Sequence, residues 1–260
     1  MLKAKHGLSF VVAAVSVLLL VACSDGVTPQ SSDSETSVST GTMTDSRDGQ
    51  TYKTVTIGTQ TWMAENLNYA YTDVPYKRGD YTSDSTSYCY KDDANNCSKY
   101  GRLYTWAAAM DSVGTWSTNG KGCGYGTTCS STYPVRGICP KGWHLPTEAE
   151  FETLFTAVGG QSTFVGESIA GKVLKSTTGW PYRDITNEEA FAFEDAFAFS
   201  ALPAGYRDLN ENFRSEGYGA YFWSSTEGNS GNAYGMGLGY SAGLDNCTKG
   251  LGFSVRCLKD

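Results

Sequence analysis

The chain has 260 residues, 40% of them hydrophobic and 13% aromatic, which is enough apolar material to bury a core. Its first 22 residues contain two lysines and no acidic residue, so 18 of the 20 Lys and Arg remain beyond them against all 27 Asp and Glu, a net charge of −9. Nucleic-acid binding is therefore disfavoured, because phosphate contacts require a basic face.

The first 22 residues have the proportions of a signal peptide. Two lysines and a histidine precede an apolar run over residues 8–22, which is too short for a comfortable membrane span. The run ends in Leu-Val-Ala before Cys23 and resembles the lipobox of bacterial lipoproteins, in which the cysteine is lipidated. The resemblance implies a lipoprotein signal peptide over residues 1–22 and acylation of Cys23. The alternatives are a transmembrane anchor and ordinary secretory cleavage with Cys23 simply buried.

Residues 23–46 are expected to form a disordered tether. Ser and Thr dominate residues 24–46, which contain no Lys or Arg, and such a segment cannot bury a core. As a flexible chain it would span roughly 25 Å. Ser24, rather than Asp, follows the cysteine, which in lipoproteins is compatible with export to an outer membrane. We therefore expect a lipid-anchored protein of the cell envelope with a folded domain over residues 47–260.

The domain is predicted to open with a β-hairpin. Residues 52–57 and 60–64 have strand character, and Gly58-Thr59 separates them. Trp62 and Met63 are expected in the core, although an exposed Trp on an edge strand would be a binding platform.

Three helices are predicted further along the chain. The first covers residues 101–110, where apolar side chains recur at helical spacing. The second follows Thr147, which forms a capping box with Glu150 ahead of an apolar stripe and ends before Gly159-Gly160. The third covers residues 167–175 and offers three side chains to the core: Ile169, Val173 and Leu174.

Strands are predicted to dominate the second half of the chain. Residues 195–203 alternate with a period of two, and residues 220–226 and 251–257 are also typical of strands. The strand at residues 234–240 places large side chains on one face and glycines on the other. The bare face lets another backbone or side chain lie close.

The cysteines are expected to form disulfides because the chain is exported. If Cys23 is lipidated, seven cysteines remain, and leaving one out allows about 105 arrangements. Local spacing favours two short bridges, and a third would join the segment before the capped helix to the last strand: Cys89–Cys97, Cys123–Cys129 and Cys139–Cys257. Cys247 is then the unpaired thiol. A metal site is disfavoured for want of histidines and of a Cys-x-x-Cys pattern.

Five segments, taken in order, resemble one family of bacterial domains. They are Asp48–Leu67, Tyr100–Met110, Cys139–Thr147, Tyr221–Thr226 and Ser254–Leu258. Together they are similar to the Fibrobacter succinogenes major paralogous domain over about residues 47–260. The resemblance implies an exported bacterial protein, often a lipoprotein, and carries no activity with it. Cys247 and the glycine-alternating strand at 234–240 depart from the family pattern, which puts the local packing in question rather than the fold.

A more distant resemblance suggests the architecture. Residues 144–151, His-Leu-Pro-Thr-Glu-Ala-Glu-Phe, are similar to a signature of the formylglycine-generating enzyme family, whose fold is related to C-type lectins. The implied fold class is α+β and C-type lectin-like, with two or three helices and a small irregular antiparallel sheet. Long loops would carry any site.

The sequence offers little for catalysis. His144 is the one histidine beyond the signal segment and could act as a general base beside Glu148 or Glu150. Those carboxylates begin a helix, however, where capping and the helix dipole already favour them. Zinc, phosphate-loop and nucleophile-elbow motifs are absent from the sequence. We therefore expect His144 to be structural and the protein not to be an enzyme.

A binding site is expected in the loop after Trp223, where related lectin-like folds build their ligand loops. Its candidate residues could hydrogen-bond a sugar or, more weakly, hold a calcium ion: Trp223, Glu227, Asn229 and Asn232. Polar residues are also common in surface loops that bind nothing, which is the alternative explanation for these side chains. The prediction is a non-enzymatic binding or adhesion domain, with polysaccharide as the possible ligand, no required cofactor and the membrane as its partner. A diverged enzyme and a purely structural envelope protein are the alternatives.

Overall fold

The computed structural model describes residues 38–78, 81–85, 87–163, 168–181, 194–239 and 241–260. They belong to one unit that extends from Thr36 to Asp260. The predicted signal peptide and the acylated Cys23 lie outside the described residues, as do residues 24–37 of the predicted tether.

The first sheet has the strand order β1-β2-β3-β14-β8 with antiparallel neighbours. Its strands are β1 (Ser39–Thr44), β2 (Thr51–Ile57), β3 (Gln60–Met63), β14 (Leu258–Lys259) and β8 (Trp143–His144). The predicted hairpin is confirmed as β2 and β3, and Gly58 takes a positive φ of 59° between them. Trp62 and Met63 are fully buried, so they belong to the core and form no binding platform.

Strand β1 corrects the predicted tether. The prediction of disorder up to residue 46 is wrong for residues 39–44, which pair along the whole of β2 from Ser39↔Thr56 to Thr44↔Thr51. Backbone pairing at a sheet edge requires no apolar side chain, and the β-branched threonines of this segment suit an extended backbone. Most side chains of β1 are exposed, which is why its composition resembles that of a linker.

The second sheet has the order β10-β9-β11-β12-β13. Its strands are β9 (Ala204–Arg207), β10 (Phe213–Glu216), β11 (Ala220–Glu227), β12 (Asn232–Leu238) and β13 (Ala242–Thr248). Its pairs are antiparallel except β9 with β11. The predicted strands at 220–226 and 234–240 are thus confirmed as β11 and β12, with shifted ends for β12 and with Tyr240 outside the described residues.

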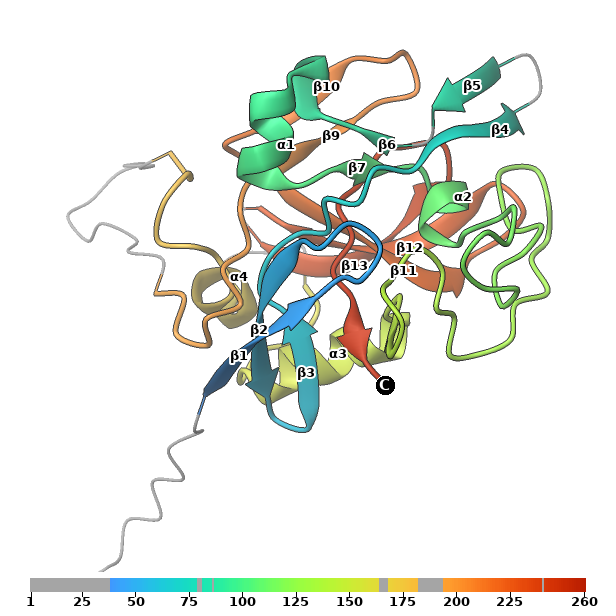
Figure 1. The fold of residues 1–260 in the computed structure, drawn as a ribbon. Coiled ribbons are helices and arrows are strands. Elements are labelled where there is room, and N and C mark those ends of the chain that lie inside the picture. The colour runs from blue at the N-terminus through green and yellow to red at the C-terminus, as the bar shows by residue number, and fades with distance from the viewer. Residues whose placement is uncertain (1–37, 79–80, 86, 164–167, 182–193, 240) are drawn as a thin grey trace, which may run out of the picture. The chain divides into compact units, whose positions relative to one another are not determined.

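Four α-helices and two small ribbons complete the described part of the chain (Figure 1). The helices are α1 (Ala94–Tyr100), α2 (Trp106–Ala109), α3 (Glu148–Ala157) and α4 (Ile169–Val173), with a 3-10 turn at Tyr90–Asp92. The ribbons pair β4 (Thr72–Arg78) with β5 (Tyr81–Ser85) and β6 (Ser87–Tyr88) with β7 (Leu103–Tyr104). The α+β class is confirmed. The predicted architecture of one small sheet with two or three helices is too small, because the described residues form two five-stranded sheets and four α-helices.

Helix α3 forms as its sequence predicts. The Thr147 hydroxyl accepts the Glu150 backbone N–H, and the Glu150 carboxylate accepts the Thr147 N–H, so the capping box is closed. The inner face of α3 packs in a core with side chains of β2, β3, β11 and β12: Val55, Ile57, Trp62, Phe151, Leu154, Phe155, Phe222, Met236 and Leu238. This core covers the face of the second sheet that carries Phe222 and Met236. Tyr221 and Gly237 lie on the opposite face.

Two of the predicted helices are only partly right. Residues 101–110 divide into β7 and the short α2, because the backbone of Tyr104 pairs with Phe253 before Thr105 caps the next turn. In α4, Val173 and Leu174 are buried as predicted, but Ile169 is 57% exposed. Ile169 is the first helical residue after the Ser168 cap, so it lies outside the buried stripe.

Two of the predicted strands are irregular. Residues 195–203 turn repeatedly, with positive φ at Asp195, Ala198 and Ser200, and the Asp195 carboxylate binds both the N–H and the hydroxyl of Ser200. Residues 251–257 form single bridges to different partners, Phe253 to Tyr104 and Ser254 to Phe222. An alternating pattern of side chains therefore does not guarantee a regular strand, because neither segment pairs continuously with one partner strand.

Candidate functional site

An open cavity of about 440 Å³ lies over the second face of the second sheet. Its floor is made by β11, β12 and β13, where Tyr221 pairs with Gly237 and Gly235 pairs with Asp245. Paired residues of neighbouring strands point to the same face, so the two glycines leave the centre of this face without side chains. The bare glycine face that the sequence predicts is thus the floor of the cavity, which we call the sheet pocket.

Aromatic rings form the walls of the sheet pocket. The Tyr206 ring lies 5.1 Å from that of Tyr221 at an interplanar angle of 73°, and 6.1 Å from that of Phe253 at 88°. Tyr221 and Phe253 stack at 5.3 Å. A Cβ on Gly235 would come within 3.3 Å of the Phe253 ring, so the glycine is what allows this ring to lie against β12. Leu209 and Leu251 add further apolar lining.

Two carboxylates and an amide lie among the lining residues. Asp208 accepts hydrogen bonds from the backbone of Asn210 and Asn212 and pairs with Arg214 at 3.0 Å. Desolvation would raise the pKa of Asp208, but these hydrogen bonds outweigh it and lower the pKa. Asp208 therefore orders its own loop. Asp245 is exposed and forms no ion pair with any described residue.

Cys247 also lines the sheet pocket, and it is the free cysteine of the described residues. Burial, followed by the nearby Asp245 charge, raises the pKa of its thiol to about 12. The sulfur is therefore a thiol at neutral pH and a weak nucleophile. Because the thiol lines the cavity, the rate at which a reagent modifies it can report whether the cavity is occupied.

The predicted site after Trp223 is not assembled as a binding surface. Trp223 is fully buried, stacks on Phe253 with ring centroids 4.4 Å apart and donates from Nε1 to the carbonyl of Tyr104. Trp223, which the sequence offered as a ligand-binding candidate, is therefore a core side chain in the structure. Asn229 accepts from the N–H groups of Gly231 and Asn232 and so closes its own turn.

Glu227 is occupied by a buried lysine. Lys249, with no exposed surface, donates to the Glu227 carboxylate and to the carbonyls of Gly124, Thr127 and Ser230 at 3.1 to 3.2 Å. The Glu227 carboxylate also accepts a hydrogen bond from the backbone N–H of Cys129. The Lys249 ammonium group thus engages the carboxylate that the sequence offered as a weak candidate calcium ligand, and the described residues contain no cluster of three acidic, His or Cys ligands for a metal.

His144 is held between two carboxylates. Its Nδ1 lies 2.8 Å from Asp260 Oδ1 and its Nε2 lies 3.1 Å from Glu150 Oε1. Burial alone would lower the pKa of His144, but the two carboxylates outweigh burial and raise it. Both ring nitrogens take part in these contacts. His144 therefore links Glu150, in the first turn of α3, to Asp260, the residue after β14, which is a structural role.

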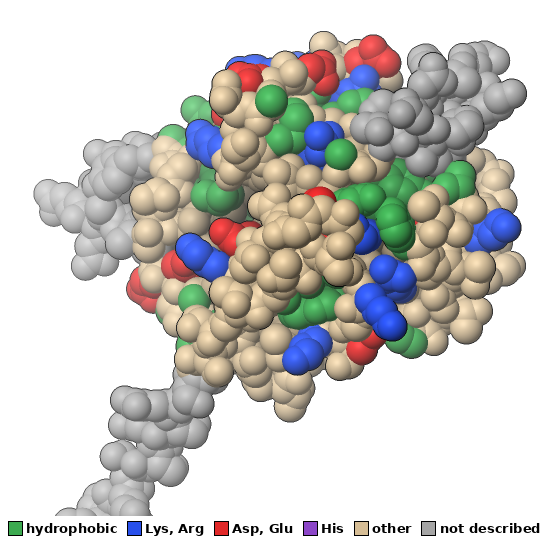
Figure 2. All heavy atoms as spheres, viewed as in Figure 1, with side chains coloured by type: hydrophobic (Ala, Val, Ile, Leu, Met, Phe, Trp, Pro, Cys, Tyr) green, Lys and Arg blue, Asp and Glu red, His purple; other side chains and the backbone are tan. Residues whose placement is uncertain are grey.

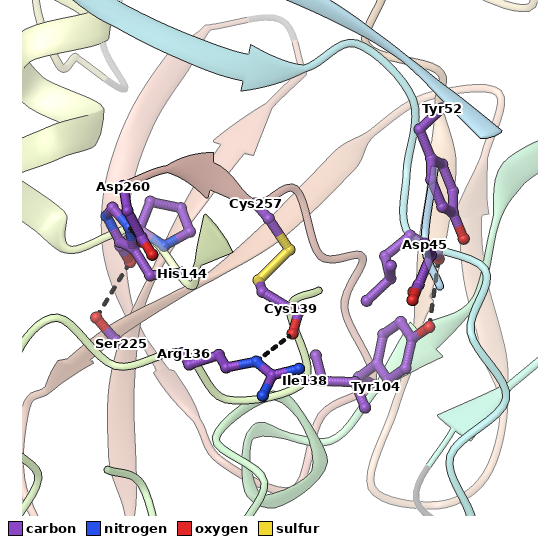
Figure 3. The surroundings of a disulfide bond; sticks show 12 residues. Asp45, Tyr52, Tyr104, Arg136, Ile138, Cys139, His144, Ser225, Cys257 and Asp260 are labelled. Carbon is purple, nitrogen blue, oxygen red and sulfur yellow. Dashed lines mark hydrogen bonds and ion pairs between the residues drawn. A yellow bond between two sulfur atoms is a disulfide. The ribbon is translucent and has the colours of Figure 1, made fainter. Parts of the chain in front are cut away.

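The three disulfides of the described chain are the three that the sequence favours. Cys89 pairs with Cys97, Cys123 with Cys129, and Cys139 with Cys257. Figure 3 shows the last bridge between two segments 118 residues apart, with Arg136 directed at the Cys139 carbonyl and with His144 and Asp260 side by side. Cys247 is the leftover thiol, as predicted.

Charges of both signs are interspersed on the molecular face in Figure 2. Its Lys and Arg side chains lie between Asp, Glu and polar groups, so this face presents no broad basic patch to a nucleic-acid backbone.

The residues of the sheet pocket were not predicted as a site. Tyr206, Tyr221 and Asp245 come from three different strands, and only the fold brings them together. The one available signal was the glycine alternation of residues 235–239, which marks a face that side chains from elsewhere can approach.

A family model described as the Fibrobacter succinogenes major domain matches residues 55–259. No match is found among the curated proteins or among the solved structures, so the likeness to formylglycine-generating enzymes and C-type lectins stays a prediction. None of the described helices has the length and apolarity needed to cross a membrane. The family and the three disulfides indicate a surface or envelope protein.

Proposed function

The chain belongs to the Fibrobacter succinogenes major domain family, and on this premise we propose that it is a lipid-anchored, non-enzymatic binding protein of the bacterial envelope. The proposed anchor is an acylated Cys23, in an outer membrane. The proposed ligand is a carbohydrate that enters the sheet pocket.

The lipid anchor is supported by the lipobox-like Leu-Val-Ala-Cys at residues 20–23 and by the charged and apolar regions before it. Metabolic labelling with an alkyne fatty acid tests the anchor. The wild-type protein is expected to carry the label and to fractionate with membranes, and Cys23→Ser is expected to lose both. Equal labelling of Cys23→Ser would refute the anchor.

The observation that carries the binding proposal is the aromatic lining of the sheet pocket. Cavities of roughly 300–1,000 Å³ with apolar walls and a few polar groups are typical ligand sites, and the sheet pocket has about 440 Å³. Tyr206 and Tyr221 supply ring surface for the C–H face of a sugar, while Asp245 and Asn210 supply hydrogen-bonding groups for its hydroxyls. A non-enzymatic role is supported by His144, whose two ring nitrogens already have carboxylate partners.

Affinity for a panel of neutral and amino oligosaccharides tests this proposal, measured with the Thr36–Asp260 unit. This unit contains the core around α3, a second core around Trp106 and Trp223, and the three disulfides of the described residues, so it can be studied by itself. Tyr206→Ala is expected to weaken binding at least tenfold. The matched control is Tyr218→Ala, because Tyr218 is 67% exposed and is not part of the lining.

The control variant is expected to bind like the wild type. Equal loss in both tyrosine variants, or binding that survives Tyr206→Ala, would contradict the sheet pocket as the site. No binding to any oligosaccharide would favour a purely structural envelope role.

A further inference from the structure

The charges of the sheet pocket are of one sign. Among the residues that the structure describes, its lining includes Asp208 and Asp245 and no Lys, Arg or His. The basic residues nearest to the lining in sequence already have partners. Arg207 stacks over the Tyr88 ring at 4.1 Å and pairs with Glu211, Arg214 pairs with Asp208, and Lys249 pairs with Glu227. An anionic ligand would therefore find no counter-charge in the lining.

The two acids are not equivalent. The carboxylate of Asp208 is balanced by Arg214 and by the N–H groups of its own loop. Asp245 lies across from Gly235 on β13 and is exposed. It accepts the N–H of Asn246 at 2.7 Å and has no ionic partner among the described residues. The uncompensated negative charge of the lining is therefore that of Asp245.

Aromatic faces add to the attraction for a cation. Tyr206 stands nearly perpendicular to Tyr221, so ring planes of two orientations border the same cavity. Phe253 is only 3% exposed and stacks with both Tyr221 and Trp223, so it supports these rings from behind. An ammonium group gains from the negative face of an aromatic ring, and this gain is larger where water is partly excluded. A neutral hydroxyl gains from neither the ring faces nor the carboxylate to the same extent.

We propose that the sheet pocket recognises an organic ammonium group, with Asp245 as its counter-ion and the rings of Tyr206 and Tyr221 as its aromatic walls. This inference rests on the proposed binding function and narrows its ligand class to sugars that carry a free amine. Acetylation of that amine removes the charge and should remove the preference.

Three tetrasaccharides of equal length test the inference: a glucosamine oligomer, its fully N-acetylated counterpart and a glucose oligomer. Tetramethylammonium is the probe for an ammonium group without a sugar. Two readouts are used, namely the dissociation constant by titration calorimetry at low salt and the rate of Cys247 modification by methyl methanethiosulfonate. Because Cys247 lines the cavity, an occupant is expected to slow its modification.

The glucosamine oligomer is expected to bind about tenfold more tightly than the two neutral oligomers and to protect Cys247. Asp245→Asn is expected to reduce this preference to within about twofold. Glu152→Gln removes the same charge from the exposed side of α3 and is expected to leave the preference unchanged. Circular dichroism and thermal melting of both variants check that they fold.

The outcomes separate the two proposals. Equal affinity for all three oligomers, or equal effects of Asp245→Asn and Glu152→Gln, would overturn the ammonium inference while carbohydrate binding stands. Binding of tetramethylammonium alone would support the ammonium inference and refute the carbohydrate ligand. Failure of every probe to bind or to protect Cys247 would overturn both.

Discussion

At the scale of single residues, buried cations organise this molecule. Lys249 satisfies three backbone carbonyls and a carboxylate, and its ammonium also lies 4.5 Å from the centre of the Trp106 ring. Arg256, equally buried, donates to the carbonyls of Phe199 and Ser200 and to the side chain of Asn66. Each cation holds irregular backbone in place. The sequence hides this role, because Lys and Arg are ordinarily surface residues.

Replacing Lys249 by Met is expected to cost about 3–5 kcal/mol of unfolding free energy, because the partly buried Glu227 carboxylate then loses its counter-charge. Urea unfolding measures the change. Lys121→Met, at an exposed lysine, is the matched control and should change stability by less than about 0.5 kcal/mol. If both variants unfold alike, Lys249 does not organise these loops. Adding Glu227→Gln to Lys249→Met is expected to recover part of the loss.

His144 is expected to make stability depend on pH. Its folded pKa is raised above the ordinary value of 6.5, so its contribution is fully present below pH 6.5 and is lost as the pH rises through the folded pKa. The contribution is on the order of 1 kcal/mol or less, since the Asp260 carboxylate is half-exposed. Urea unfolding of wild type and His144→Gln at pH 5.5 and 8.5 measures it. A difference between the two proteins that is no larger at pH 5.5 would be inconsistent with this role.

At the scale of elements, helices and strands set by neighbouring residues could be predicted from the sequence, whereas strand pairing between distant segments could not. Helix α3 follows from its capping box and apolar stripe, and β2, β3 and β11 follow from strand-forming residues beside turn signals. Strand β1 has a linker's composition and exists because β2 offers it a free edge. Residues 195–203 have a strand's alternation, yet three positive φ angles bend them into turns. A distant strand decided the first case, and a turn closed by Asp195 and Ser200 decided the second.

Gly235 tests the construction of the sheet pocket at this scale. Gly235→Ala places a Cβ 3.1 Å from the Phe222 carbonyl and 3.3 Å from the Phe253 ring, so the ring must move. The expected cost is about 1–3 kcal/mol, together with weaker ligand binding. Thermal melting and titration measure the two effects.

The same change at Gly171 is the matched control. An added Cβ there meets neighbours only at 3.6 Å, within α4, so Gly171→Ala is expected to be neutral or to stabilise by up to about 1 kcal/mol. Equal behaviour of the two alanine variants would show that Phe253 does not depend on the bare glycine face.

At the scale of the whole molecule, one disulfide joins the two halves of the chain. The spacing of the cysteines favoured the two short pairs, because each has a near partner. Cys139, Cys247 and Cys257 then remain, and Cys257 was chosen as the partner of Cys139 because that bridge ties the capped helix to the last strand. The site was not predictable in the same way. Its lining comes from β9, the loop after it (residues 208–210), β11, β12, β13, Leu251 and Phe253. The sequence instead suggested a site within one loop, beside a tryptophan that is buried.

Removal of the long bridge is expected to cost the most stability. By chain entropy, replacing Cys139 and Cys257, which are 118 positions apart, by alanine is expected to cost about 5 kcal/mol, against about 2.5 kcal/mol for Cys89 and Cys97, which are eight positions apart. Urea unfolding of both double variants compares them. A larger loss from the short bridge would show that loop length does not govern the stability of this fold.

The central claim is that ligands bind over the glycine face of the second sheet rather than in the loop after Trp223. Amide NMR of the isotope-labelled Thr36–Asp260 unit, titrated with the glucosamine tetrasaccharide, tests it most directly. The amide signals of Gly235, Gly237, Asp245 and Cys247, which line the cavity, are expected to shift with a common dissociation constant. Shifts confined to residues 228–232, or none at saturating ligand, would contradict the claim.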